Sequence, residues 1–143
     1  MRRRSPTPSE TEFERLLAFR LALRRFLRWS EEQAAAEGVT STQYELLLAI
    51  RGHRGEAGPT IGELAETLVL RHNSAVGLVD RAADAGLVTR GIDPDDHRVV
   101  RVRLTRRGDA CIGRLARAHL AQLPALAGPV EQAAAIATRG GRA

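Results

Sequence analysis

The chain has 143 residues, of which 43% are hydrophobic and 27% are charged, and this composition predicts one globular domain and excludes extended disorder. All 22 basic residues are arginine, and against 17 acidic residues they give a net charge of +5, which favours a polyanionic partner. No apolar run approaches a membrane span, and the basic N-terminus lacks the apolar core of a signal peptide, so we expect a cytoplasmic protein without membrane contact.

The charges are distributed in blocks along the chain. Residues 1–28 carry a net +5, residues 29–70 carry −5, residues 71–107 carry +3 and residues 108–143 carry +2. Charge alone leaves two interpretations open. The basic blocks form either a nucleic-acid-binding surface or an ordinary solvated surface in a protein that uses arginine as its base.

The N-terminal part of the chain predicts a flexible basic arm over residues 1–8 and then a long helix. Ser9 and Glu12 have the spacing of a capping box, and the helix is expected to run to about Ala36 and end at Gly38. Its apolar residues cover more than one stripe, which exceeds what one small domain buries and suggests a partner subunit. A central helix wrapped by its own chain is the alternative. The apolar residues are Phe13, Leu16, Leu17, Phe19, Leu23, Phe26, Leu27 and Trp29.

Two more capping-box spacings predict two further helices. Thr42 with Glu45 opens a helix that ends by Gly52, and Thr60 with Glu63 opens a short one. A turn and a fourth helix follow, and Gly86 is placed to close that helix in a left-handed conformation. Two short helices joined by a tight turn predict a helix-turn-helix. The polar face of its second helix carries Asn73, Ser74, Gly77, Arg81 and Asp84.

The pattern then changes to alternation over residues 87–92 and 99–104, which predicts a β-hairpin with a polar tip at 93–98. A lone arginine on such a ribbon can enter the minor groove of DNA while a carboxylate holds its guanidinium. Asp96 and Arg98 have this arrangement. The alternative is a solvated turn with an exposed ion pair. A helix is expected from about Thr105 to Pro124, and a short last segment from 129 to 138.

These segments together resemble the MarR family of winged-helix transcription regulators, over about residues 11–125. The resemblance implies a mostly α (α+β) fold: a winged helix-turn-helix with a two-stranded β-wing, and N- and C-terminal helices that form a dimerisation region. It implies a dimerisation helix at 9–38, a DNA-binding lobe at 39–104 and C-terminal dimerisation helices at 105–143. The segments that carry the resemblance are 60–65, 74–81, 86–90, 93–98 and 104–108.

The resemblance also implies roles for single residues. Asn73 and Ser74 would read the major groove, Arg81 would contact the DNA backbone, Asp96 would brace the wing and Arg98 would enter the minor groove. Helix capping is the alternative for the first two, and pairing with Asp84 is the alternative for Arg81. The chain departs from many relatives at Val76 and Gly77, so base reading there is sparse or rests on the neighbouring residues. The predicted DNA-binding set is Arg71, His72, Asn73, Ser74, Gly77, Arg81, Asp96 and Arg98.

The expected function is therefore a homodimeric repressor that binds a palindromic operator in double-stranded DNA. The resemblance implies release by a small aromatic or acidic effector, bound between the dimer helices and the DNA-binding lobes. By position, Trp29, Tyr44, Arg51 and His53 line such a pocket, although core packing explains Trp29 and Tyr44 equally well. A winged-helix module that binds proteins instead of DNA remains the alternative.

The sequence gives no sign of an enzyme, a cofactor or a metal site. The four histidines are scattered, and no Cys-x-x-Cys motif or nucleophile turn is present. The single cysteine, Cys111, lies within a predicted helix, where we expect a buried inert thiol; a redox sensor is the alternative.

Overall fold

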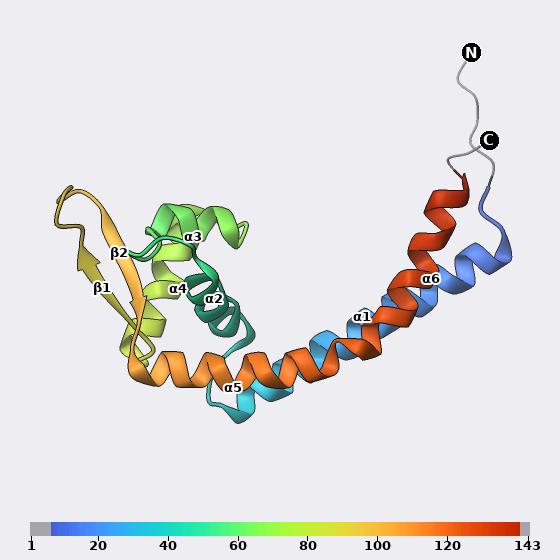
Figure 1. Cartoon of the computed structure of the whole chain (residues 1–143), viewed down its shortest axis with the longest axis horizontal. Helices are drawn as coiled ribbons and strands as arrows, with labels where there is room; N and C mark the ends of the chain where they lie inside the picture. The colour runs from blue at the N-terminus through green and yellow to red at the C-terminus, as the bar shows by residue number, and fades with distance from the viewer. Residues whose placement is uncertain (1–6, 141–143) are drawn as a thin grey trace, which may run out of the picture. The chain divides into compact units, whose positions relative to one another are not determined.

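The computed structural model describes residues 7–140, so most of the predicted basic arm lies outside the described residues. The predicted mostly α fold with one two-stranded sheet is confirmed (Figure 1). In chain order the elements are α1 (Glu10–Ala36), α2 (Ser41–Gly52), α3 (Ile61–Thr67), α4 (His72–Asp84), β1 (Val88–Ile92), β2 (Val100–Leu104), α5 (Arg106–Gln122) and α6 (Pro124–Gly140).

The chain forms two compact units. The helical unit contains the residues up to Ser30 and those from His119 onwards, and the lobe contains Glu31–Ala118. Helices α2, α3 and α4 and the β1–β2 hairpin pack around the core of the lobe, as Figure 1 shows. The largest fully buried side chains of this core are Leu46, Leu47, Leu64, Leu87, Leu115, Val79 and Val102.

The hairpin is antiparallel, and its register pairs Ile92 with Val100 at the end near the tip. The loop before α3 adds a third backbone segment, because the N–H of Val102 donates to the carbonyl of Pro59 at 2.9 Å. Gly58 has a φ of +82°, and a Cβ there would lie 2.7 Å from the Val102 carbonyl oxygen. Only glycine allows the backbone at residue 58 to lie this close to β2. The close contact holds the wing against the segment that leads into α3.

The predicted capping boxes are confirmed at two of three helices. The Ser9–Glu12 pair caps α1, and the Thr60–Glu63 pair caps α3. The third prediction is wrong, because α2 begins two residues earlier than expected: the Thr40 Oγ1 accepts from the Gln43 N–H at 3.1 Å, and the Gln43 Oε1 accepts from the Thr40 N–H at 3.0 Å.

The C-terminal prediction also needs correction. Residues 124–140 form one helix, α6, where a break and a shorter segment were expected. Pro124 occupies the first helical position, where its missing N–H costs nothing. Pro129 lies inside the helix, where it removes one backbone hydrogen bond without ending the helix.

Three helices end in the same hydrogen-bonded turn with a residue of positive φ. Gly38 after α1 and Gly86 after α4 have φ of 76° and 73°, so the predicted role of Gly86 is confirmed. At the end of α3 this position is Val69, with a φ of 55°. The Leu70 N–H donates to the Ala65 carbonyl at 2.8 Å, which makes the turn a Schellman motif with valine where glycine is usual.

We expect the replacement of Val69 by glycine to raise the free energy of unfolding by about 0.5–1 kcal/mol. A left-handed conformation costs an L-residue roughly 1–2 kcal/mol, and glycine avoids this cost. Part of the resulting gain in stability is lost again, because glycine has more conformational freedom in the unfolded chain. The side chain of Val69 makes little packing, since the residue is 90% exposed. Urea unfolding of Val69→Gly measures the effect, and the reciprocal variant Gly86→Val should lose stability. Equal effects of the two variants would contradict this interpretation.

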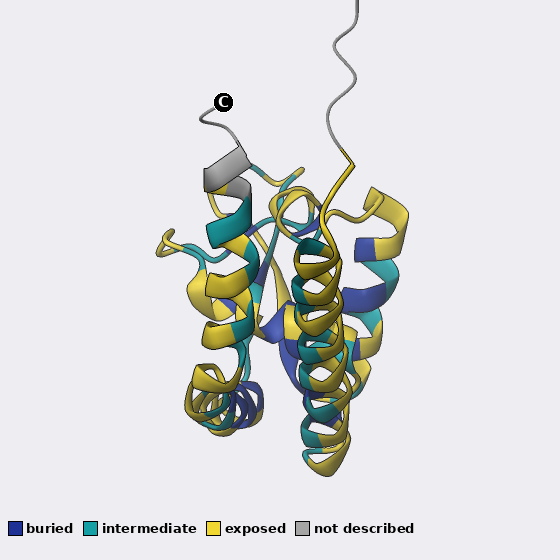
Figure 2. Cartoon of the chain, turned by 90° about the vertical axis from the view of Figure 1, so that its right-hand side faces the viewer, coloured by how far each residue is buried: buried dark blue, intermediate teal, exposed yellow. Residues whose placement is uncertain are grey.

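The helical unit contains a small aromatic cluster and many exposed apolar side chains. The Ser30 Oγ and the His119 Nε2 are hydrogen-bonded at 2.7 Å, and the rings of Phe26 and Trp29 contact the His119 ring at centroid distances of 5.9 and 4.9 Å. Along the rest of α1 much of the surface is exposed, as Figure 2 shows for the helix that follows the grey N-terminal trace. None of the described helices is both long and apolar enough to cross a membrane.

Candidate nucleic-acid interface

The first turn of α4 is polar and points to solvent. The N-cap is Arg71, which makes no side-chain capping hydrogen bond, and the helix begins at His72. Asn73 and Ser74 therefore lie inside the first turn and do not cap it, so the capping alternative is wrong for both. All four residues are exposed, and neither Asn73 nor Ser74 forms a side-chain hydrogen bond with any residue in the range 7–140. Their donors and acceptors are available to an external partner.

Gly77 and Arg81 form one local arrangement on the same face of α4. A Cβ on Gly77 would lie 3.1 Å from an η nitrogen of Arg81, so the guanidinium lies over the glycine, one turn towards the helix N-terminus. The alternative pairing of Arg81 with Asp84 does not occur within the described chain. Glycine at 77 thus brings a cation close to the polar first turn.

The opposite face of α4 is fixed to the lobe. Its predicted apolar stripe is buried, and an ion pair between Asp80 and Arg90 joins the helix to β1. Because burial determines which face points inward, the polar first turn has one orientation relative to the hairpin. The buried residues are Ala75, Leu78, Val79 and Ala82.

At the wing tip a carboxylate holds an exposed guanidinium, as predicted. The Asp96 Oδ1 accepts from the backbone N–H of Arg98 at 3.1 Å and from its Nε at 3.2 Å, and Oδ2 accepts from a terminal nitrogen at 3.4 Å. The Arg98 side chain is 91% exposed. Hydrogen bonds from the Arg98 side chain, and then from its backbone N–H, lower the pKa of Asp96, so the carboxylate stays ionised at neutral pH.

The root of the wing contains a buried carboxylate. The Asp93 Oδ1 accepts from the backbone N–H groups of Asp95 at 2.8 Å and Asp96 at 3.1 Å, which shapes the turn. Its Oδ2 accepts from the Arg101 Nε at 2.8 Å. The Arg101 side chain, followed by the two N–H groups, lowers the pKa of Asp93.

Arg101 connects this carboxylate to the helix-turn-helix. One terminal nitrogen of its guanidinium donates to the Gly58 carbonyl at 3.0 Å and lies 3.9 Å from the carboxylate of Glu63. Glu63 is the capping-box residue of α3, so one side chain joins the wing, the preceding loop and the first helix of the motif. The orientation of the wing is therefore coupled to α3.

Arg101 was not among the site residues predicted from the sequence. Its place in the alternating strand identified only an outward position. The hairpin register contained the missing signal: the Asp93 N–H donates to the Val99 carbonyl at 2.9 Å, so Arg101 is the diagonal neighbour of Asp93 on the same face.

The residues expected to line an effector pocket have partners within their own units. Tyr44 belongs to the lobe core, and Trp29 packs in the aromatic cluster of the helical unit, so core packing explains both. Arg51 pairs with Asp109 at 3.1 Å on an exposed surface, whereas His53 lines a cavity.

Cys111 is buried, and burial followed by the negative charge of Glu37 raises the pKa of its thiol, which makes it a poor thiolate. Within residues 7–140, no group of three or more His, Cys, Asp or Glu side chains could hold a metal ion.

Comparisons with known proteins agree with this architecture. Residues 37–99 match the model of the MarR family. A mutant of Escherichia coli MarR complexed with operator DNA is 26% identical to the chain, covers 68% of both chains and has a TM-score of 0.60. CouR of Rhodococcus jostii bound to p-coumaroyl-CoA is 25% identical, covers 68% of this chain and 66% of its own, and has a TM-score of 0.61.

A more distant structure extends the similarity in fold to nearly the whole chain. YusO of Bacillus subtilis is 20% identical, covers 96% of this chain and 99% of its own, and has a TM-score of 0.69. A comparison with curated protein sequences finds no match. The fold is that of a winged-helix protein with long terminal helices. The resemblance to the MarR family of winged-helix regulators that was stated from the sequence is confirmed by the family model and by these structures.

Proposed function

We propose that the chain is a cytoplasmic transcription repressor that binds a palindromic operator as a homodimer. In this proposal the first turn of α4 enters the major groove and the wing enters the minor groove. The observation that carries it is the combination of two outward elements: a polar α4 turn whose Asn73 and Ser74 have no side-chain hydrogen bond to any described residue, and the exposed Arg98 side chain at the wing tip.

The geometry of α4 suits base reading. An α-helix fits the major groove, and residues in its first turn reach the base edges in helix-turn-helix docking. That turn supplies guanidinium, imidazole, amide and hydroxyl groups, from Arg71, His72, Asn73 and Ser74. The Arg81 guanidinium over Gly77 would meet a phosphate beside the groove. In this proposal the first turn of α4 reads the base sequence, and the phosphate contact of Arg81 adds affinity for DNA without regard to sequence.

The wing supports the second contact. The minor groove concentrates negative potential and attracts a lone guanidinium. Asp96 limits the rotamers of Arg98, so less conformational entropy is lost when the arginine binds.

The helical unit supports the homodimer. Apolar side chains of α1 and α6 remain exposed in the single chain, such as Leu17 at 59% and Leu27 at 52%. The proposal requires that a second copy that covers them places two α4 helices roughly 34 Å apart, which is one turn of DNA. The other exposed apolar side chains of the helical unit are Phe13, Leu16 and Leu21 on α1, Leu120 on α5, Leu123 between α5 and α6, and Val130 on α6.

Release by a small-molecule effector is part of the proposal. CouR, a relative of similar fold, is bound to p-coumaroyl-CoA. An effector of this chain must bind the DNA-incompetent arrangement more tightly than the DNA-bound one, since otherwise it releases nothing.

The test is binding to DNA fragments selected from a genomic library by the purified full-length chain. Arg98→Ala should weaken operator binding about tenfold or more and leave the dimer intact, because the residue has no packing role. Arg117→Ala removes the same charge from an exposed position on α5 and serves as the matched control. Equal effects of the two variants would remove the wing assignment.

Asn73→Ala tests the reading helix separately. It should change the preferred bases at one position of the operator, by about 1–3 kcal/mol, and leave the salt dependence of binding unchanged. If the chain selects no DNA at all, the proposal fails and the protein-binding module gains support.

A further inference from the structure

The turn between α3 and α4 contains an apolar residue that does little for the stability of the lobe. Val69 has a φ of 55°, in the left-handed region that β-branched residues rarely adopt. The residue is also 90% exposed, the largest value among the exposed large apolar residues in the range 7–140. Glycine, the usual residue of this turn, would avoid the strain with little loss of packing.

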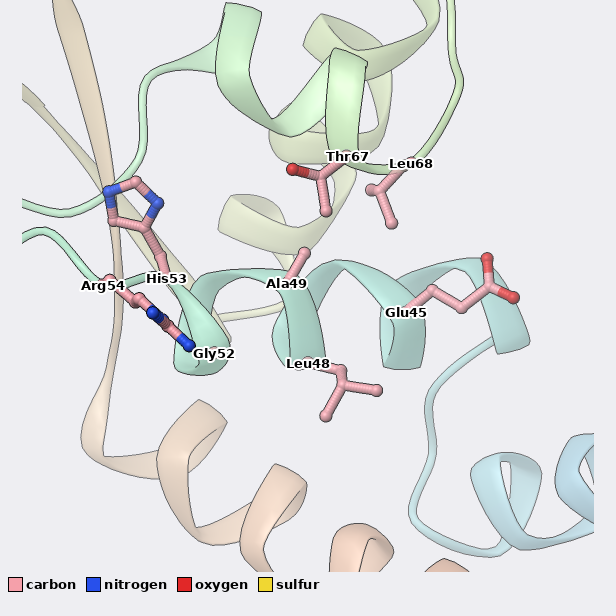
Figure 3. A pocket seen from close by; sticks show the side chains of 8 residues that line it. All are labelled: Glu45, Leu48, Ala49, Gly52, His53, Arg54, Thr67 and Leu68. Atoms are coloured by element: carbon pink, nitrogen blue, oxygen red, sulfur yellow. The ribbon is translucent and has the colours of Figure 1, made fainter.

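The residues on both sides of Val69 are held by the lobe. Leu68 packs against the core, and its side chain faces α2 across a cavity that both helices line (Figure 3). The backbone N–H of Leu70 donates to the Ala65 carbonyl at 2.8 Å, which closes the turn. The turn therefore has one fixed shape, and it exposes the side chain of Val69 to solvent.

Val69 lies next to the polar first turn of α4. Arg71 is the N-cap of this helix, and two steps along the chain separate it from Val69. Because consecutive Cα atoms are about 3.8 Å apart, the Cα atoms of Val69 and Arg71 are at most about 7.6 Å apart. Base pairs follow each other at about 3.4 Å along the axis of DNA. A first turn that reads bases thus brings Val69 within about two base-pair steps of the bases that the turn reads.

We infer that Val69 is a specificity-determining residue that contacts the C5 methyl group of a thymine in the operator. This inference rests on the proposed function, in which the first turn of α4 enters the major groove. A valine side chain neither donates nor accepts hydrogen bonds, and the thymine methyl is the apolar group that a base pair presents in that groove. The free chain bears the strain at Val69 because the complex uses its methyl groups.

The surroundings of Val69 favour DNA over a protein as the partner. Residues 67–74 contain no acidic side chain, and Arg71 and His72 are both exposed. The apolar surface is also small, since its exposed neighbour Leu70 is only 36% exposed. Surfaces that bind proteins usually present a continuous apolar patch of several hundred Å² or roughly that size.

The test replaces single thymines of the selected operator by deoxyuridine, which lacks only the C5 methyl group. For the full-length native chain, one such replacement in a half-site should weaken binding about fourfold, the effect of one buried methyl-sized group. Val69→Gly should weaken binding to the thymine operator about fourfold for each half-site, and the same replacement should then have no effect. This variant is expected to be more stable than the native chain, so misfolding does not explain a loss of affinity.

Two further variants separate the methyl contact from other effects. Val69→Asn removes the methyl groups but tolerates the left-handed conformation, so it should be as insensitive to deoxyuridine as Val69→Gly. Leu48→Ala is the matched control, because Leu48 is an apolar residue of α2 that is 44% exposed and points away from the end of α3 (Figure 3). This variant should keep the fourfold difference between thymine and deoxyuridine.

The outcomes separate this inference from the proposed function. Equal binding of the thymine and deoxyuridine operators at every position would overturn the inference, and so would a difference that persists in Val69→Gly. A changed base preference in Asn73→Ala would still support the proposed function in both cases. A uniform loss of affinity in Val69→Gly, with no thymine affected more than another, would mean that the valine only holds the turn. If the chain binds no duplex at all, the proposed function and the inference both fail.

Discussion

Replacing Gly108 by alanine is expected to destabilise the lobe by about 3 kcal/mol, at the upper end of ordinary overpacking. A Cβ at this position would lie 2.0 Å from the carbonyl oxygen of Leu87, which is far inside van der Waals contact. The neighbouring atoms belong to the backbone and cannot rotate away. The Leu87 carbonyl also accepts from the Thr105 N–H at 3.0 Å and from its Oγ1 at 3.1 Å, so any shift breaks the cap of α5.

Urea unfolding followed by circular dichroism measures this effect. The matched control is Gly113→Ala on the same helix, where a Cβ meets no atom within 4 Å. This variant should gain about 0.5–1 kcal/mol, because alanine is the better helix former. Similar losses in both variants would show that the contact with Leu87 is not the cause. Thr105 and Gly108 act together here: the Thr105 Oγ1 accepts from the Gly108 N–H at 3.0 Å, and the missing side chain of Gly108 leaves room for the Leu87 carbonyl.

Arg101→Gln should lower the affinity for DNA about tenfold, although the hydrogen-bond partners of Arg101 are the Asp93 carboxylate and the Gly58 carbonyl of the same chain. Its guanidinium joins Asp93 to the Gly58 carbonyl, and loss of this link frees the root of the wing. The wing would then hold Arg98 in many orientations. DNA binding would have to fix one of them, and the entropy lost in doing so would lower the affinity. A fluorescent operator duplex measures the affinity.

The matched control for Arg101 is Arg103→Gln, two residues along the same strand and on the same outward face. It removes the same charge from an exposed side chain that has no ion pair within the described residues. The Arg101 variant should lose more affinity than the Arg103 variant and exchange amide protons faster at residues 93–98. Equal losses would mean that both arginines act only through their charge.

The link also has a pH dependence of known sign. The pKa of Asp93 is lower in the folded chain than in the unfolded one, so its contribution to stability is present above the unfolded value of about 3.9 and is lost as the pH falls through the folded value. At neutral pH Asp93 is therefore ionised, and its hydrogen bond with Arg101 holds the root of the wing. Asp93→Asn should unfold with less dependence on acid pH below about 4.

Local sequence signals predicted much of the fold. The box of Thr60 and Glu63 was found because the two residues lie three positions apart and each accepts a hydrogen bond from the backbone N–H of the other. The start of α2 was misplaced because the spacing occurs twice: Thr40 with Gln43 satisfies it as well as Thr42 with Glu45. Pro124 was predicted to end a helix but begins α6, since a proline at the first helical position starts a helix as readily as one elsewhere ends it.

The candidate site was predictable where one element determines it. Helical periodicity alone placed Asn73, Ser74 and Arg81 on the outward face of α4. The anchoring of the wing was not predictable in this way, because Arg101 and Gly58 are 43 residues apart and meet only through tertiary packing. The cavity between α2 and α3 could not be predicted from the pattern of a single helix either, because residues of both helices line it.

The central claim is that this chain binds duplex DNA through its arginines, and a salt titration of operator binding tests it most directly. Each phosphate contact releases counterions, so the affinity should fall linearly with salt on logarithmic axes. The slope should decrease by about one in Arg81→Ala, the predicted phosphate contact, and stay unchanged in Asn73→Ala. No binding at low salt, or an affinity that does not change with salt, would contradict the account.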